Sequence, residues 1–232
     1  MAQTMKRIVW FIAFAAGAGC DGGNQARMQD RAMNEMAVAM QAAASSVVIA
    51  PATSPAQRAL FEQNLVAENA TYLTLSASPE ELDFLRKIEG VIPTVSNDQA
   101  LGSRELRRIM ARTSALKSVG ADIVGTLPDA GRRESVLFRL PTHKLGMLAV
   151  WDYKADDGKM FVMQDFLKFR VAGEQASLSL SQNFADARCI WTLSWNTDTE
   201  DYALYLEDER TPAGSTRWHP DSIRAFAEEL TR

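Results

Sequence analysis

The sequence has few of the residues on which enzyme active sites are usually built. It contains two histidines, His143 and His219, and two cysteines, Cys20 and Cys189. It has no Gly-x-Ser-x-Gly segment, no His-Glu-x-x-His motif and no glycine-rich phosphate loop. Both histidines fall where turns or caps are expected, and Cys189 falls in an expected strand with no evident base beside it. The sequence therefore predicts no catalytic residue, metal site or cofactor, and a hydrolase using carboxylates or His219 remains the enzymatic alternative.

The chain also lacks an excess of positive charge and a long apolar run. Its 25 Lys and Arg are outnumbered by 29 Asp and Glu, which gives a formal net charge of -4. Dedicated nucleic-acid-binding domains are usually basic, so this balance predicts no nucleic-acid partner. The apolar stretch at residues 8–16 is about half as long as the ~20 residues that a membrane-spanning helix needs. The 47% hydrophobic and 23% charged residues are typical of a globular domain.

The short apolar stretch has the flanks of an export signal. Lys6 and Arg7 precede it, and small residues follow it at positions 17–20, with the sequence Gly-Ala-Gly-Cys. This arrangement resembles the signal peptide of a bacterial lipoprotein. The resemblance covers about a tenth of the chain and implies cleavage before Cys20, acylation of its thiol and anchoring to a membrane by the acyl chains. Asp21, by similarity to lipoproteins of enteric bacteria, implies the periplasmic face of the inner membrane as the destination.

A second cleavage site leaves another destination open. Residues 16–18, Ala-Gly-Ala, also fit the small-x-small pattern of ordinary signal-peptide cleavage. Cleavage after Ala18 would give a soluble periplasmic or secreted protein that keeps both thiols, so that a bridge between Cys20 and Cys189 becomes possible. Lipidation of Cys20 would instead leave Cys189 as a free thiol.

The rest of the chain divides into a tether and one domain. Residues 20–53 are rich in Ala, Met and Gln between Gly- and Pro-containing ends, and we expect them to be partly helical. Residues 54–232 form the expected domain, with helices within 54–120, a sheet over 134–209 and a helix at 220–231. Ser-Pro pairs followed by Gln or Glu mark the first two helix starts, which predicts helices ending near Asn69 and Glu89. A third helix is expected over 104–119, before Gly120.

From residue 134 the apolar period changes to two, which predicts strands. The expected strands are 135–140, 147–153, 160–171 with a possible break, 177–182, 189–196 and 202–207. Short polar segments predict hairpins at 155–158 and 196–201. The predicted fold is α+β: N-terminal helices packed on a mostly antiparallel β-meander of about 5–6 strands, closed by a C-terminal helix.

Three tryptophans form the first candidate site. Trp191 and Trp195 alternate with polar residues in one expected strand, and Trp151 lies in another. If they line a concave surface, they could hold a lipid or another amphiphilic molecule. If they face the helices, they belong to the core.

A row of basic residues forms the second candidate site, on the helix expected at 104–119. It consists of Arg104, Arg107, Arg108, Arg112 and Lys117. On a membrane-anchored protein such a face could contact anionic lipid headgroups or an acidic partner. The alternative is a solvated helix face paired with carboxylates. Together these features predict a non-enzymatic envelope lipoprotein that acts by contact with a protein partner, with a lipid carrier or sensor as the alternative.

Overall fold

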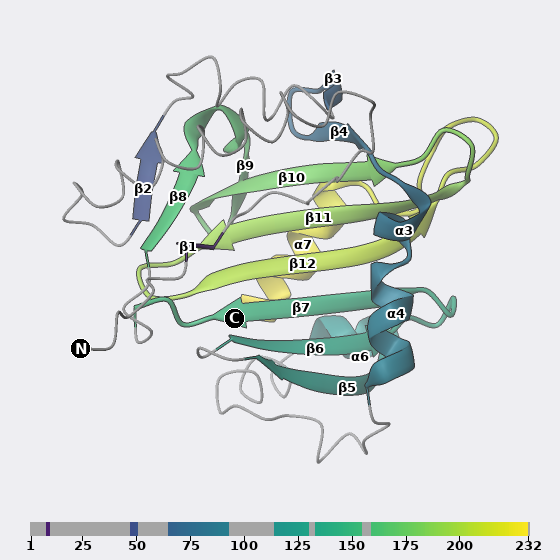
Figure 1. The fold of residues 1–232 in the computed structure, drawn as a ribbon, viewed down its shortest axis with the longest axis horizontal. Coiled ribbons are helices and arrows are strands. Elements are labelled where there is room, and N and C mark those ends of the chain that lie inside the picture. Colours follow the sequence, from purple (N-terminus) through teal and green to yellow (C-terminus); the bar gives the residue numbers. More distant parts are fainter. Residues whose placement is uncertain are drawn as a thin grey trace, which may run out of the picture.

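The protein is built around one large, mostly antiparallel β-sheet with helices on both faces (Figure 1). The computed structural model describes residues 8–9, 47–50, 65–92, 114–129, 133–154 and 159–231. The nine strands of the large sheet are β3 (Leu65–Glu68), β4 (Leu73–Ser76), β5 (Asp122–Asp129), β6 (Arg133–Arg139), β7 (Leu145–Trp151), β9 (Phe169–Val171), β10 (Glu174–Gln182), β11 (Arg188–Asn196) and β12 (Asp201–Glu209). The helices are α3 (Pro79–Leu82), α4 (Phe84–Val91), α6 (Ser114–Ser118) and α7 (Pro220–Thr231), with a 3-10 turn at Gln164–Phe166.

Two meanders meet in the middle of this sheet. The spatial order is β3-β4-β10-β11-β12-β7-β6-β5, and β9 pairs with β10 beside this path. β10, β11 and β12 follow one another as antiparallel neighbours, as do β5, β6 and β7, and the two sets join where β12 pairs with β7. β4 runs parallel to β10. A second, parallel sheet places β8 (Lys159–Met163) between β1 (Ile8–Val9) and β2 (Val47–Ala50).

The main core lies between the sheet and the helices α6 and α7, on what we term the α7 face. Alternate residues of the central strands point to this face because successive side chains of a strand lie on opposite sides. The ring of Trp195 stacks on Tyr202 of the paired strand at 5.0 Å and 6°. The core includes Val136, Phe138, Leu148, Leu178, Trp191, Leu193, Trp195, Leu204, Leu116, Ile223, Phe226 and Leu230.

The opposite face, the α4 face, is covered at one end of the sheet by α3 and α4. Leu85 of α4 packs with Leu137, Leu145 and Met147, and Leu82 of α3 packs with Ile190. The start of α3 has a full capping box, in which the Ser78 hydroxyl accepts from the Glu81 amide and the Glu81 carboxylate accepts from the Ser78 amide. The apolar packing and the cap together fix α3 and α4 on the sheet.

Two glycines meet specific backbone demands. Gly173 follows Ala172 in the two-residue turn between β9 and β10, and their φ angles of 89° and 50° fit the type I′ turn of a tight hairpin. Gly146 faces Phe138 across β7 and β6, and a Cβ at Gly146 would lie 2.3 Å from the Phe138 ring. The aromatic ring therefore occupies the space that a side chain at position 146 would need.

The predicted α+β fold is wrong: the structure is mostly β-sheet, with nine strands in the large sheet where about 5–6 were expected, and helices are few among the described residues. The expected helix ending near Asn69 is contradicted at its end, where Leu65–Glu68 is strand β3. Its partner β4 and the edge strand β5 were not expected at all. Pairing with a neighbouring strand outweighs the local helix propensity of residues such as Ala67.

The hairpin expected at 155–158 is also wrong, because β7 lies between β6 and β12 while β8 belongs to the smaller sheet. The hairpin at 196–201 is confirmed, with Asn196 paired to Asp201. The second helix is present, but Asp83 divides it into α3 and α4 and it passes Gly90 to reach Val91. Most of the helix expected at 104–119 lies outside the described residues, and its end is confirmed by α6.

Candidate functional site at the charged end of the sheet

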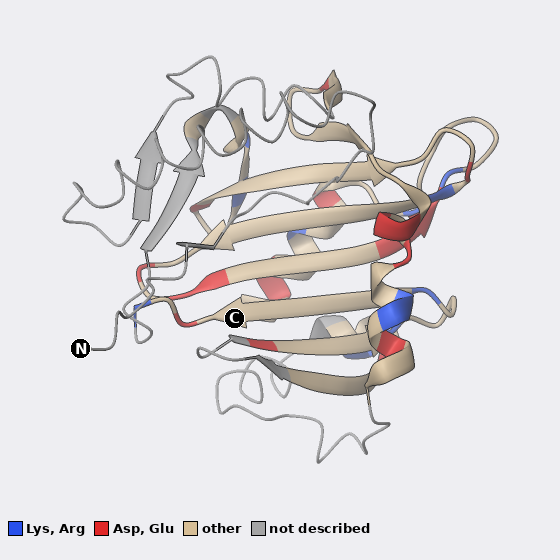
Figure 2. Cartoon of the chain, viewed as in Figure 1, with Lys and Arg blue, Asp and Glu red and all other residues tan. Residues whose placement is uncertain are grey.

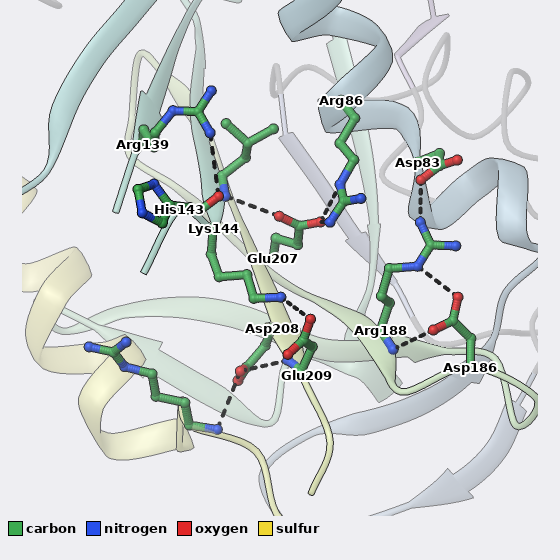
Figure 3. Close-up of polar contacts among 12 residues, drawn as sticks. Asp83, Arg86, Arg139, His143, Lys144, Asp186, Arg188, Glu207, Asp208 and Glu209 are labelled. Atoms are coloured by element: carbon green, nitrogen blue, oxygen red, sulfur yellow. Dashed lines mark hydrogen bonds and ion pairs between the residues drawn. The ribbon is translucent and has the colours of Figure 1, made fainter. Parts of the chain in front are cut away.

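Charged residues lie along α3 and α4 and at the adjacent ends of the strands (Figure 2). Three ion pairs connect α4 and its N-cap residue Asp83 with the sheet, and we term them the charge ladder. Figure 3 shows two of them, Asp83–Arg188 and Arg86–Glu207. Asp83, Arg86 and Glu89 are three residues apart and so lie along one side of the helical segment. The ladder consists of Asp83–Arg188, Arg86–Glu207 and Glu89–Arg139, with partners on β11, β12 and β6. Along the helical segment the charges are negative, positive and negative, and each partner on the strands has the opposite charge. A shift of α4 by one step of this pattern would place like charges together, so the ladder specifies the register of α4 on the sheet.

Glu207 is the buried centre of the ladder. Its side chain is 2% exposed, and its Oε1 accepts from Nε and Nη2 of Arg86 at 2.9 and 2.8 Å. Its other oxygen accepts from the Leu145 amide at 3.2 Å. A buried carboxylate is tolerated only when it is paired and hydrogen-bonded, and Glu207 meets both conditions.

Asp208, the next residue, performs a similar task on the α7 face. It is 4% exposed, and its carboxylate accepts from the amides of Trp218 at 2.9 Å, Arg217 at 3.4 Å and Glu209 at 2.8 Å. These bonds hold the segment that leads from β12 to α7. The two adjacent carboxylates thus secure two different elements to opposite faces of the same strand.

The loop between β10 and β11, residues 183–187, extends beyond the ladder and is held firmly. The Asn183 side chain accepts from the Ala185 amide at 2.9 Å and donates to the Ala77 carbonyl at 3.2 Å. Asp186 accepts from the amide and Nε of Arg188 at 3.0 and 2.7 Å. These bonds to Arg188 also lower the pKa of the Asp186 carboxyl below its ordinary value. The loop is fixed to the segment between β4 and α3, to β11 and, through Arg188, to the ladder.

Arg210 closes the same loop from β12. Its amide donates to the Ala187 carbonyl at 2.7 Å, and Nη2 donates to the carbonyls of Asn183 and Asp186 at 2.9 and 3.1 Å. Its guanidinium carbon lies 5.7 Å from the centre of the Phe184 ring, which is 65% exposed. We term the ladder, the loop 183–187 and Arg210 together the charged end. It presents one exposed aromatic ring, that of Phe184, on a rigid support.

Most polar groups described at this end form structural bonds, and Nε of Arg210 is an exception. Both buried carboxylates accept from chain donors, and Lys144 pairs with Glu209. His143 occupies an exposed turn with φ 61°, and its carbonyl accepts from Arg139 at 3.4 Å. No group of three or more His, Cys, Asp or Glu side chains suited to a metal occurs among the described residues. The polar side chains of this end mainly hold neighbouring elements in place.

The structure places the three candidate tryptophans on different faces. Trp191 and Trp195 are 2% and 1% exposed and lie in the core of the α7 face. Trp151 pairs with Asp201, one residue from Tyr202 in β12, so it points to the α4 face, where it contacts Tyr153 at 6.0 Å. The three rings do not converge on a common surface.

Other predicted residues divide between described and undescribed positions. Cys20, Asp21, Arg104, Arg107, Arg108 and Arg112 lie outside the described residues. Lys117 is exposed on α6. His219 directly precedes α7; its amide donates to the Ser222 hydroxyl at 2.9 Å, and its carbonyl accepts from that hydroxyl at 2.8 Å. These backbone bonds fit its role as a helix cap.

Cys189 is a free and fully buried thiol. Burial, with a smaller contribution from the Asp208 carboxylate, raises the pKa of the Cys189 thiol to about 12. Only the thiolate is a strong nucleophile, so the thiol is poorly suited to covalent chemistry. Its place among the α7-face residues is that of a small hydrophobic side chain.

The chain matches no protein-family model, no curated protein and no solved structure. No helix among the described residues has both the length and the apolar character required to cross a bilayer.

The ladder and the loop were not predicted from the sequence. The alternating charges of Asp83, Arg86 and Glu89 at spacing three in a predicted helix were a detectable signal of a paired helix face. Phe184 was also detectable, because it is the one large apolar residue of the short segment 183–187 between two predicted strands. Their partners on the sheet are distant in sequence and give no local signal.

Proposed function

We propose that the protein is a membrane-anchored lipoprotein of the bacterial cell envelope that acts by contact with a protein partner and not by catalysis. The anchor is inferred from residues 1–20, which resemble a lipoprotein signal peptide, with Cys20 as the acylated residue. Asp21 supports the periplasmic face of the inner membrane as its location.

The contact function is supported by one observation above others. At the charged end, buried charges are used to hold helices and loops in place, while a large aromatic ring stays exposed. Catalytic sites instead direct polar groups toward a place where substrate can sit. Rigid support combined with exposed apolar surface is characteristic of interaction surfaces.

The anchor is tested with the two cysteines of the chain. Cys20→Ala should abolish labelling by a fatty-acid probe and move the protein from the membrane fraction to the soluble fraction. Cys189→Ala is the matched control, because it removes a buried thiol and leaves the acylation site intact. Membrane association of Cys20→Ala equal to that of the unaltered chain would refute lipidation.

A further inference from the structure

Phe184 is exposed although the loop around it is among the best-secured segments of the charged end. Side chains of Asn183, Asp186 and Arg210 fix the loop by the bonds described for residues 183–187. None of these bonds involves the Phe184 ring, whose exposed fraction is 65%. A turn of this kind does not need an aromatic residue at that position, so the ring calls for another explanation.

Arg210 gives the surface beside the ring its charge. Within the described part of the chain no carboxylate pairs with its guanidinium, whose Nη2 bonds two carbonyl oxygens and whose Nε is buried without a partner. Carbonyl groups do not neutralise a guanidinium. The exposed ring therefore lies next to a formal positive charge that forms no ion pair within the described part of the chain.

We propose that Phe184 and Arg210 form the central contact of the charged end, and that they bind a protein surface with an apolar pocket bordered by Asp or Glu side chains. This inference rests on the proposed contact function and names the part of the surface that makes the contact. Aromatic residues and arginine dominate the energetics of protein interfaces. A loop that is already rigid loses little conformational entropy on binding, which favours affinity.

The charge pattern favours a protein over an anionic bilayer. Asp186 lies two residues from the ring, and Asp83 lies on the adjacent helical segment. Both carboxylates pair with Arg188, so this part of the surface has no excess of positive charge that would attract anionic headgroups. A single exposed ring, between Asn183 and Ala185, suits one pocket better than a lipid surface, which usually takes a broader apolar face.

The experiment places a photo-crosslinking amino acid at one position at a time in the full-length chain, in the cells that produce it. Position 184 is compared with Val66 and Val91, which are exposed at 44% and 75% and lie in β3 and α4. We expect one discrete protein adduct at position 184 and none of the same mass at the other two. The captured protein, identified by mass spectrometry and purified, is then titrated with the full-length chain.

In that titration Phe184→Ser should weaken binding by about 30-fold, as expected for an interface hot spot. Arg210→Gln, which keeps an amide donor for the loop carbonyls and removes the charge, should weaken binding and flatten its dependence on salt. Thermal unfolding of both variants checks that the loop change has not disturbed the fold. Unchanged affinity in folded Phe184→Ser would overturn the proposal.

Three other results would also overturn it. The first is an adduct at position 66 or 91 with none at position 184. This result would keep the proposed contact function but assign the binding to another surface of the protein. The second is Phe184-dependent sedimentation with vesicles of phosphatidylglycerol and phosphatidylethanolamine, which assigns the ring to lipid. The third is a self-association of the chain that Phe184→Ser abolishes. Absence of adducts at every position would count against the contact function itself.

Discussion

Removal of Arg86 tests whether the charge ladder holds α4 on the sheet. We choose Arg86→Met because methionine keeps most of the length and apolar stem of arginine while it removes the guanidinium. Glu207 would then keep only the Leu145 amide as a donor, at 3.2 Å. Its carboxylate is 2% exposed, so solvent cannot easily replace the lost partner.

The expected loss follows from the burial of the two partners. Breaking a fully buried ion pair costs about 3–5 kcal/mol, whereas an exposed pair contributes about 0–1 kcal/mol. The Arg86 side chain is 49% exposed, which screens the pair and lets water approach from one side. We therefore expect Arg86→Met to lower the free energy of unfolding by about 2 kcal/mol, between these limits.

The double variant Arg86→Met/Glu207→Met gives the decisive comparison. It removes the stranded carboxylate, so the main remaining penalty is the Leu145 amide, about 1 kcal/mol. The double variant should therefore be more stable than Arg86→Met alone, which corresponds to a favourable coupling between the two residues of about 1–2 kcal/mol.

Urea unfolding followed by tryptophan fluorescence measures these values, because Trp191 and Trp195 lie in the core. Asp221→Asn is the matched control: its pair with Arg224 spans 3.4 Å and Asp221 is 91% exposed, so we expect a change within about 0.5 kcal/mol. The ladder does not hold α4 if Arg86→Met lowers the free energy of unfolding no more than the control does. The same conclusion follows if the loss in the double variant equals the sum of the losses in Arg86→Met and Glu207→Met.

Two further predictions concern packing and pH. Gly146→Ala should destabilise the fold by about 1–3 kcal/mol, because its methyl group would meet the Phe138 ring. Gly90→Ala is the control: Gly90 has open space around it in α4, so this change should be neutral or stabilising. Equal effects of the two changes on urea unfolding would exclude the close contact. Burial raises the pKa values of the Tyr153 and Tyr205 hydroxyls from about 10 to about 12, with a smaller effect of nearby carboxylates. The folded chain therefore holds protons that the unfolded chain releases, so stability is complete below about pH 10 and is lost as the pH rises through 12. Tyr205→Phe should reduce this alkaline loss, and an unchanged pH profile of urea midpoints would contradict the assignment.

The closing helix was predictable because its signals are local. Pro220 begins α7, and Ile223, Phe226, Ala227 and Leu230 are its buried residues, as the 3.6-residue period of the sequence predicts. The strand from Cys189 to Asn196 was also found, with an added residue at its start. A segment can be predicted from its own residues when its hydrophobic period and the residues at its boundaries indicate the same type of element.

The edge strand β5 was missed for an identifiable reason. Its sequence contains Gly125 and Pro128, which both interrupt a strand pattern. In the structure the register with β6 shifts between Ile123 and Gly125, which is the signature of a bulge. Proline is accepted because β5 is at the edge of the sheet, where one side of its backbone needs no strand partner. Edge position is a property of the assembled sheet and cannot be read from the segment itself.

The two faces of the sheet explain why the tryptophan question could not be answered from the sequence. Alternation of Trp191 and Trp195 with Thr192 and Ser194 showed which residues share a face, but Ser194 is also buried, at 7% exposed. A sheet covered on both faces buries small polar residues on one side as readily as rings on the other. The alternation of polar and apolar residues then no longer identifies a solvent-exposed face. The position of Trp151 on the α4 face depends on the pairing of β12 with β7, two strands about fifty residues apart in the sequence. The same long-range pairing brings Glu207 beneath Arg86, so the core and the candidate site escaped prediction for one reason: both depend on how the two meanders join.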